Sequence, residues 1–500
     1  MTRPITRVLI ANRGEIACRI AATCRVMGIE TVTVFAEDDH ALPHASIGEM
    51  ACVLEGDGLA ATYLNSAALI AAAQKTRADA IHPGYGFLSE NAAFADAVTK
   101  AGLTFIGPSA EVIAKMGDKA ASRILCKEIG VPTVPGYDGE SRDIKLLAKE
   151  AERIGYPILV KAAAGGGGKG MRVVEHAKEL EAALSAARAE AKNAFGDDRV
   201  LLEKYLLTPR HVEVQVFSDM HGNHLHLYER DCSVQRRHQK IIEESPAPHL
   251  PAATRQAMAA EAIKITKHIG YTGAGTIEFI MDASGAFYFL EMNTRLQVEH
   301  PVTEMVTGLD LVQLQLDVAM GKKLPFTQED IAQRGHAIEV RLYAEDPARD
   351  FMPSPGTLQQ FELPQLPRIR AENGYRAGNV VSSRYDPMIA KLVAYGATRD
   401  EAIARLSDAL HRTRISGVTH NRYYLLRVLN HPAFIAGNVS TDFVKTHSAS
   451  LVEPEVPTEI AAAFAAAYLL LQGATLGASN PADATQEYSA WTDRNVAGMR

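Results

Sequence analysis

Hydrophobic runs and helical spacings alternate along the first hundred residues of the chain. The apolar run Arg7–Ala11 predicts a short strand, and the spacing of apolar residues in Gly14–Met27 predicts a helix behind it. Further strands are predicted over Glu30–Ala36, Ala78–His82 and Leu103–Ile106. Because strands that alternate with helices build βαβ units, we expect an α/β domain with a parallel sheet.

The pattern changes after the segment Gly130–Gly136. Ile158–Ala162 and Met171–Val174 predict two strands joined by a glycine-rich loop, and a charged helix follows as far as Lys192. We interpret residues 132–204 as a small, mobile α+β subdomain.

Strand signals of mostly antiparallel character dominate from His211 to Asn293. Prolines then separate short strands, until a helix is predicted over Arg399–Thr413. In the Ala- and Pro-rich tail, the apolar run Ile460–Leu471 is too short for a bilayer, which needs about 20 residues. We interpret this run as part of a docking helix.

Composition narrows the class of protein. The 500 residues are 47% hydrophobic and 22% charged, which is typical of a globular chain. This length corresponds to about three domains. A formal net charge of -7 argues against general nucleic-acid binding, so any anion site must be local. The cysteines are scattered without a CxxC pair, which favours reduced thiols and argues against a zinc site. They are Cys18, Cys24, Cys52, Cys126 and Cys232.

The glycine-rich segment Ala164–Gly170 is the strongest functional signal. It contains a GxGxxG pattern, but a strand is predicted after it, whereas the dinucleotide-binding fingerprint must open a helix. No Ser or Thr follows Lys169, so the P-loop pattern fails as well. Because consecutive glycines carry a large entropic cost, we predict a hairpin that covers nucleotide phosphates, with Lys161 beside it, rather than an idle turn.

Two glutamates lie on either side of the predicted turn Asp282–Gly285. If residue 281 pairs with 286, or 282 with 287, Glu278 and Glu291 share one sheet face, and in the second register they lie directly opposite. With Asn293, they offer hard oxygen ligands that suit Mg²⁺ or Mn²⁺. The alternative is a solvated polar face, against which the flanking apolar residues argue.

Polar residues in three further segments suggest a ligand site. Arg295 can clamp a small anion, and Glu299 can take a proton from it. The segment Glu229–Lys240 adds local positive charge and leads into the apolar pair Ile241–Ile242, which favours a strand lining a site over a solvated basic face or a targeting tract. The turn His82–Asn91 follows the carboxyl end of a predicted parallel strand, where ligands of open α/β sheets bind.

Together these motifs resemble the biotin carboxylase component of biotin-dependent carboxylases, which are ATP-grasp enzymes. The resemblance runs from about Val8 to Lys445 and is carried by residues 10–16, 82–91, 116–119, 164–170, 230–240, 291–300 and 385–391. It implies an α/β ATP-grasp fold with a mobile glycine-loop lid. The expected domains are a Rossmann-like domain at 1–117, an ATP-grasp domain at 118–330 with its lid at 132–204, and a β-rich C-terminal domain at 331–446.

The resemblance implies that ATP and bicarbonate form carboxyphosphate, whose CO₂ carboxylates N1 of biotin. Glu278, Glu291 and Asn293 would hold Mg²⁺ or Mn²⁺. The implied ATP-binding residues are Lys119, Lys161, Gly167, Gly168, Met171, Glu203, Lys204, Tyr205, Leu206, His211, Gln235, His238 and Lys240.

The resemblance also divides the remaining roles between bicarbonate and biotin. Arg295, Gln297 and Val298 would bind bicarbonate, and Glu299 would deprotonate it. Arg341 would stabilise the biotin enolate, which is an oxyanion-hole task, with Tyr85 and Gly86 beside the ring. The implied catalytic residues are Arg295, Glu299, Lys240 and Arg341.

The sequence most resembles the α subunit of an acyl-CoA carboxylase of the methylcrotonyl or geranyl type. The expected partners are a biotin carboxyl carrier domain, a carboxyltransferase β subunit and a second copy of the chain or a larger α/β complex, without nucleic acid or membrane. No Ala/Val-Met-Lys-Met biotinyl motif occurs, so we expect biotin on a carrier domain that this sequence does not contain. Residues 447–500 would begin a docking domain, with Arg500 a processing boundary, and the location would be a bacterial cytosol or a mitochondrial matrix.

Two alternatives remain open. One is the amino-terminal part of a pyruvate or urea carboxylase, and downstream sequence would distinguish it from an acyl-CoA carboxylase subunit. The other, of a different class, is a non-catalytic module that binds ATP or a carrier without turnover. The presence of Lys240, Glu299 and Arg341 argues against such a module, which has no reason to keep all three.

Overall fold

The computed structural model describes residues 4–139, 141–162, 171–237, 239–452 and 467. The chain divides into two compact units, Met1–Leu451 and Val452–Arg500, and the sheets of the described residues lie in the first. The predicted tail helix over Ile460–Leu471 falls outside the described residues except for Ala467, which is helical. Among the described residues, no helix has the length and apolar character needed to cross a bilayer.

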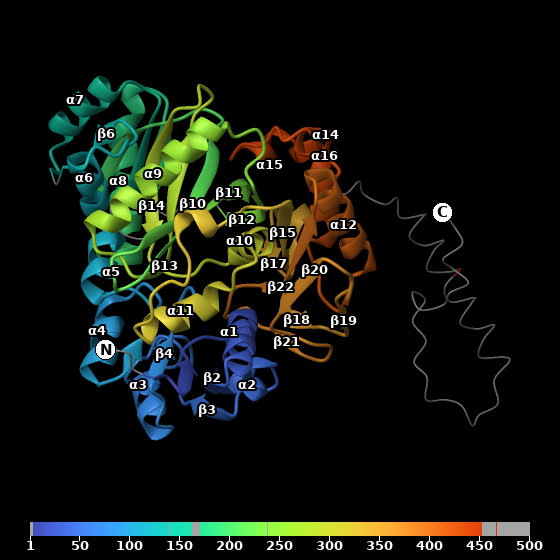
Figure 1. Ribbon diagram of the computed structural model, residues 1–500. Coiled ribbons are helices and arrows are strands. Elements are labelled where there is room, and N and C mark those ends of the chain that lie inside the picture. The colour runs from blue at the N-terminus through green and yellow to red at the C-terminus, as the bar shows by residue number, and fades with distance from the viewer. Residues whose placement is uncertain (1–3, 140, 163–170, 238, 453–466, 468–500) are drawn as a thin grey trace. The chain divides into compact units, whose positions relative to one another are not determined.

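A parallel five-stranded sheet forms the N-terminal part, as predicted (Figure 1). Its central strand is buried because it carries the apolar run that begins at Arg7. The order of its strands is β3 (Met50–Leu54), β2 (Glu30–Ala36), β1 (Arg7–Ile10), β4 (Ala80–His82) and β5 (Thr104–Phe105). The helices of this part are α1 (Gly14–Val26), α2 (His44–Ile47), α3 (Ser66–Lys75), α4 (Ala92–Lys100) and α5 (Ala110–Gly117).

A separate four-stranded antiparallel sheet corresponds to the predicted subdomain at 132–204. Helices α7 (Ile144–Ile154) and α8 (Leu180–Phe195) contribute apolar side chains to the core beneath it. The sheet order is β6 (Gly136–Tyr137), β9 (Val200–Lys204), β7 (Ile158–Ala162) and β8 (Arg172–Val174). The predicted glycine hairpin, with Gly167 and Gly168, lies outside the described residues.

An eight-stranded sheet runs through the rest of the first unit and carries most of the predicted site. Its order is β14 (Phe287–Asn293), β13 (Gly273–Met281), β10 (Arg210–Ser218), β11 (His224–Arg236), β12 (Gln239–Ser245), β15 (His336–Tyr343), β22 (Met388–Gly396) and β20 (Ile369–Asn373). Because β12 pairs with β15, the sheet is continuous across the expected domain boundary at residue 330, which stays a prediction.

Helices and short hairpins surround this sheet. The helices are α6 (Lys119–Glu128), α9 (Ala252–His268), α10 (His300–Thr307), α11 (Leu311–Ala319), α12 (Arg399–Arg412), α13 (Arg422–Leu429), α14 (Pro432–Ile435), α15 (Phe443–Thr446) and α16 (Ser448–Leu451). The short strands pair as β16 (Glu345–Asp346) with β17 (Met352–Pro353), β18 (Gly356–Thr357) with β21 (Val380–Val381), and β19 (Gln360–Glu362) with β23 (Arg414–Ser416).

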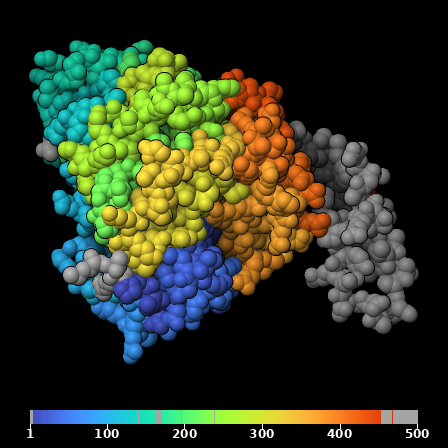
Figure 2. Space-filling view, viewed as in Figure 1, coloured from blue at the N-terminus to red at the C-terminus, as the bar shows by residue number. Residues whose placement is uncertain are grey.

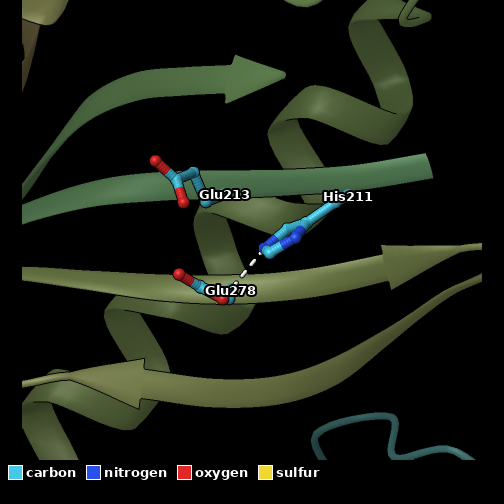
Figure 3. A group of neighbouring side chains, drawn as sticks. All are labelled: His211, Glu213 and Glu278. Carbon is cyan, nitrogen blue, oxygen red and sulfur yellow. Dashed lines mark ion pairs between the residues drawn. The ribbon is translucent and has the colours of Figure 1, made fainter. Parts of the chain in front are cut away.

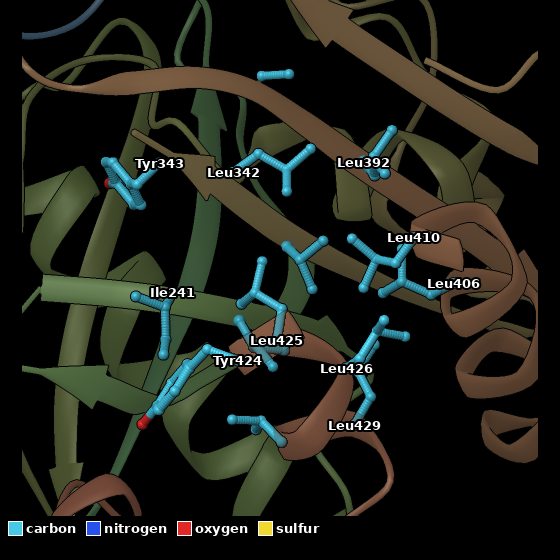
Figure 4. Packing of buried hydrophobic residues seen from close by; sticks show 14 of the residues in the cluster. Ile241, Leu342, Tyr343, Leu392, Leu406, Leu410, Tyr424, Leu425, Leu426 and Leu429 are labelled. Atoms are coloured by element: carbon cyan, nitrogen blue, oxygen red, sulfur yellow. The ribbon is translucent and has the colours of Figure 1, made fainter. Parts of the chain in front are cut away.

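Alternation of side chains gives the large sheet one apolar and one polar face. In β10, His211, Glu213 and Gln215 alternate with valines that pack in one core with side chains of α9. In the same way, Leu342 and Leu392 pack against Leu406 of α12 (Figure 4). Helix α10 lies over the other face, beside β15 and β22, so that polar side chains there are buried.

The N-terminal part and the large sheet are in contact around this polar face. Helix α1 lies next to α11 and β20, and the space-filling view has the N-terminal residues directly against the segments that follow β14 (Figure 2). Side chains from sequence positions as distant as 15 and 391 can therefore belong to one site.

Candidate functional site

The predicted pair of carboxylates forms in the second predicted register, but the pairing next to the turn differs from both predictions. Next to the turn, Met281 pairs with Phe287, which is neither predicted register. Continued unchanged, this pairing would place Glu278 opposite residue 290 and turn Glu291 to the other face. A β-bulge shifts the pairing after Phe279, so Glu278 lies directly opposite Glu291.

These carboxylates and Asn293 form a group of hard oxygen donors. Lys119 donates to Glu291 Oε2 at 2.5 Å, and Asn293 Nδ2 donates to Glu278 Oε1 at 2.8 Å. Asp118 caps α6 by accepting from two backbone amides, which fixes Lys119 at the first residue of that helix. Ammonium groups already balance the charge of these carboxylates. The same oxygen donors therefore also fit a hard divalent cation.

Figure 3 shows a third acidic residue, Glu213, beside Glu278 and His211. Glu213 pairs in register with Glu278, and the ligand atoms of all three side chains lie within 4.8 Å of one another. His211 Nε2 is 2.9 Å from Glu278 Oε2. Burial lowers the pKa of His211, but the Glu278 carboxylate outweighs it and raises that pKa above its usual value.

Lys240 is the central cation of the site. Its Nζ donates to Glu213 Oε2 at 2.6 Å, to Glu278 Oε1 at 2.8 Å and to Glu299 Oε1 at 2.7 Å. Burial opposes the charged form, yet the three carboxylates raise the pKa of Lys240 well above its usual value. Lys240 is therefore a fixed positive charge that a polyanionic ligand can share.

Glu299, which pairs with Lys240, also forms an ion pair with Arg341. Arg341 donates from Nη2 to Glu299 Oε2 at 2.9 Å and from Nε to Glu243 Oε1 at 2.7 Å. Burial alone would raise the pKa of Glu299, but Lys240 and Arg341 lower it below its usual value. Burial raises the pKa of Glu243 to about 7 despite the neighbouring guanidinium. Glu299 is thus held as a carboxylate within reach of two cations.

The predicted bicarbonate residues lie on the segment between β14 and α10. Arg295 donates from Nε to Glu90 Oε2 and from Nη2 to Asn293 Oδ1, each at 2.8 Å. Gln297 accepts from the fully buried Arg230 at 2.5 Å and donates to Glu278 Oε1 at 2.9 Å. These contacts link the predicted anion residues directly to the carboxylate pair.

The predicted biotin residues meet this centre from the N-terminal part. Tyr85 follows β4 and donates its hydroxyl to Glu15. Burial raises the pKa of Tyr85 well above its usual value, and the Arg341 guanidinium opposes that rise. Gly86 has φ +66°, a backbone conformation that favours glycine. The turn that contains both residues is thus tied to α1 through Glu15.

Apart from Lys119 on α6, the described nucleotide residues lie on or next to the four-stranded sheet and on strands of the large sheet. Lys161 Nζ is 2.5 Å from Glu203 Oε1, and burial lowers the pKa of Lys161 despite that carboxylate. Gln235 Nε2 lies 2.8 Å from His211 Nδ1. Met171 directly precedes β8; Lys204 ends β9, and Tyr205 and Leu206 follow it. His238, like Gly167 and Gly168, lies outside the described residues.

Sequence reasoning assigned no role to four buried charged residues in this centre: Glu213, Arg230, Glu243 and Lys391. The available signal was strict alternation, for example of Glu213 with Val212 and Val214. Such alternation also describes a strand with one solvated face, so it does not by itself identify a buried polar face.

Three family models match most of the chain. The model described as "Biotin carboxylase, N-terminal domain" matches residues 4–113. "Carbamoyl-phosphate synthase L chain, ATP binding domain" matches residues 118–327, and "Biotin carboxylase C-terminal domain" matches residues 339–446.

Two curated relatives show about half of their aligned residues identical. The chain is 49% identical over 475 residues to "Methylcrotonoyl-CoA carboxylase subunit alpha, mitochondrial" of Dictyostelium discoideum, covering 95% of this chain and 68% of that one. It is 50% identical over 442 residues to "Biotin carboxylase 2" of Bacillus subtilis, covering 88% and 99%. The corresponding mouse α subunit is covered over 63% of its length, so the chain spans about two thirds of such subunits.

A solved structure shares the fold. The biotin carboxylase domain of Hydrogenobacter thermophilus 2-oxoglutarate carboxylase, a dimer in complex with MgADP, ADP and bicarbonate, has a TM-score of 0.88 and 43% identity. The match covers 91% of this chain and 100% of that one. The fold class expected from the sequence is confirmed.

Proposed function

The chain belongs to the biotin carboxylase family, and we propose that it uses ATP and bicarbonate to carboxylate biotin through carboxyphosphate. The observation that carries this proposal is the buried centre in which Lys240, Glu299 and Arg341 adjoin the carboxylate pair Glu278 and Glu291. It combines an anion-binding cation, a candidate base, a second cation for a developing negative charge and oxygen donors for a divalent metal.

We propose that the phosphates of ATP bind between the two sheets. Lys119 and Lys161 come from different elements, and each is within 2.5 Å of a carboxylate that it can exchange for a phosphate oxygen. Glu278, Glu291 and Asn293 would hold Mg²⁺ or Mn²⁺ beside them. When bound, the metal neutralises charge on the phosphate oxygens.

Bicarbonate is proposed to bind on the segment between β14 and α10. Arg295 offers a guanidinium that is already oriented by Glu90 and Asn293, and Gln297 and Val298 extend the same segment. Lys240 and Arg341 keep Glu299 ionised in the absence of ligands. When bound ligands form ion pairs with these two cations, the cations stabilise the Glu299 carboxylate less, so that Glu299 would accept the bicarbonate proton. The freed bicarbonate oxygen then attacks the γ-phosphorus of ATP and displaces ADP.

Arg341 is proposed to act on biotin. The phosphate released with CO₂ from carboxyphosphate takes the N1 proton of biotin, which places negative charge on the ureido oxygen. A desolvated guanidinium stabilises such charge more effectively than water does. Glu243 accepts a hydrogen bond from Arg341, and Tyr85 and Gly86 would lie beside the biotin ring. The enolate then attacks CO₂ released from carboxyphosphate.

The direct test of this function is release of ADP from ATP by the full chain with free biotin and Mg²⁺. Because bicarbonate is the nucleophile, we expect omission of bicarbonate to lower the rate by at least about tenfold, and removal of Mg²⁺ by EDTA to stop turnover. ADP release that is independent of bicarbonate would reject the carboxylase proposal.

The whole protein is proposed to be the α subunit of an acyl-CoA carboxylase of the methylcrotonyl or geranyl type. The α-subunit relatives support this proposal. The solved relative is a dimer, which supports a second copy of the chain as a partner. Its other partners would be a biotin carboxyl carrier domain and a carboxyltransferase subunit. All five cysteines are free thiols, which supports a reducing compartment such as a bacterial cytosol or mitochondrial matrix.

A further inference from the structure

The ammonium group of Lys391, on β22, joins three separate segments of the chain. Its side chain is 0% exposed, and Nζ lies 2.7 Å from the Val298 carbonyl oxygen, 2.9 Å from Glu372 Oε2 and 3.2 Å from Glu15 Oε1. An ammonium group has three donors, so these three partners use them all. Nothing in the proposed chemistry so far requires this residue.

The position of Lys391 is fixed by the register of the large sheet. It lies directly opposite Arg341 of β15 and opposite Glu372 of β20, so the three side chains share the polar face. Lys391 is therefore the neighbour of the residue proposed to act on biotin, yet its own charge is taken up by two carboxylates.

The hydrogen bond to Val298 bears on the proposed base. Val298 lies between Gln297 and Glu299 in a segment that is neither helix nor strand. Lys240 and Arg341 hold the Glu299 carboxylate, whereas Lys391 fixes the peptide group from which Glu299 extends. The carboxylate and its backbone are thus secured from different elements.

The ion pair with Glu15 extends the same connection to the biotin side. Glu15 lies in the first turn of α1 and is buried, and it accepts a hydrogen bond from the Tyr85 hydroxyl. Through Glu15 and Val298, one buried cation ties the Tyr85 turn of the N-terminal part to the bicarbonate segment.

We propose that Lys391 is a positioning residue that sets the distance between the bicarbonate segment and the biotin site. This inference rests on the proposed function. When this distance is correct, CO₂ forms beside the biotin enolate and the N1–C bond forms. When it is not, ATP and bicarbonate still become ADP, hydrogen phosphate and CO₂, but the CO₂ escapes and biotin stays uncarboxylated.

The test is the ratio of ADP released to carboxybiotin formed, measured with radiolabelled bicarbonate and free biotin. For Lys391→Met we expect carboxybiotin formation to fall about 100-fold, as a misplacement of about 1 Å can cause. Bicarbonate-dependent ADP release should fall less than about tenfold, and the KM for ATP should change less than about threefold. The ratio therefore rises by about tenfold or more. A ratio equal to that of the unchanged protein would overturn the inference.

A matched control is available in the same part of the fold. Arg399 of α12 pairs with the buried Glu244 at 2.7 Å, so Arg399→Met also breaks a partly buried ion pair, but one that does not touch the Val298 segment. It is expected to lower stability and leave the ratio unchanged. A raised ratio in this variant would show that general loosening of the fold uncouples ADP release from carboxylation, and it would contradict the positioning role of Lys391.

Loss of Lys391 leaves the buried Glu15 without its cation, whereas Glu372 keeps its ion pairs with Arg370 and Arg19; an unmatched buried charge can prevent folding. The double variant Lys391→Met/Glu15→Gln removes the unmatched charge while a glutamine oxygen can still accept from Tyr85, and it is expected to fold and to show the same raised ratio. If neither protein folds, Lys391 is a structural residue and the inference is rejected. Failure of the proposed function would differ, because the unchanged protein itself would then show no bicarbonate-dependent ADP release.

Discussion

Replacing Arg341 by alanine is expected to lower the rate of biotin carboxylation by about two to three orders of magnitude, as loss of an oxyanion-stabilising donor does. The guanidinium is buried, with Glu243 and Glu299 holding it on the polar face of the sheet, so its charge is poorly screened where the ureido oxygen would lie. Carboxylation of free biotin, followed with radiolabelled bicarbonate, measures the effect.

The affinity of Arg341→Ala for ATP is expected to change less than about threefold, because Lys119 and Lys161, which we propose to bind the phosphates, lie on other elements. Binding of a fluorescent ATP analogue gives that affinity independently of turnover. Equal losses in nucleotide binding and in biotin carboxylation would contradict the role assigned to Arg341, since they would indicate damage to the whole site.

Replacing Glu299 by glutamine is the second change with a large expected effect. Glutamine has nearly the same shape but cannot accept the bicarbonate proton, so both bicarbonate-dependent ADP release and carboxybiotin formation should fall by about two to four orders of magnitude. They should fall together, since both follow the same deprotonation. Steady-state rates measured over a range of bicarbonate concentrations separate this loss in kcat from weaker bicarbonate binding.

Glu244→Gln provides the matched control for Glu299. Glu244 is also buried and also bonded to cationic partners, with His336 Nε2 and Arg399 Nε each 2.7 Å from its Oε2. It follows Glu243 along β12, and these contacts are separate from Lys240 and Arg341. We expect lower stability with little change in turnover; near-normal turnover of Glu299→Gln, by contrast, would rule out Glu299 as the base.

The carboxylate pair illustrates how far the sequence could lead. Alternation along two strands placed Glu278 and Glu291 on one face, and the structure has them directly opposite. The pairing nearest the turn was wrong, and a bulge between Phe279 and Glu278 corrects it. A bulge adds one residue without a distinct pattern of hydrophobicity, so strand periodicity alone could not predict it.

The charged partners that surround the site residues were less predictable than the site residues themselves. Arg341 was identified by resemblance alone, and Glu299 and Lys240 also by the chemistry of their segments. The partners that set their charges come from distant positions, such as Glu213 and Glu243. A charged residue on a strand normally indicates a solvated face. Only the packing of α10 and the N-terminal part over the sheet makes that face a buried one, and such packing is not encoded in any short window of sequence.

The central claim is that bicarbonate attacks ATP to form carboxyphosphate, and bicarbonate labelled with oxygen-18 tests it most directly. The oxygen that attacks the γ-phosphorus stays on phosphorus when CO₂ leaves, so the account predicts one labelled oxygen in each phosphate released. Mass spectrometry of the phosphate from the full chain, turning over with ATP, Mg²⁺ and biotin, gives the result. Phosphate without the label, released at the same rate as ADP, would mean that water attacks ATP and would contradict the account.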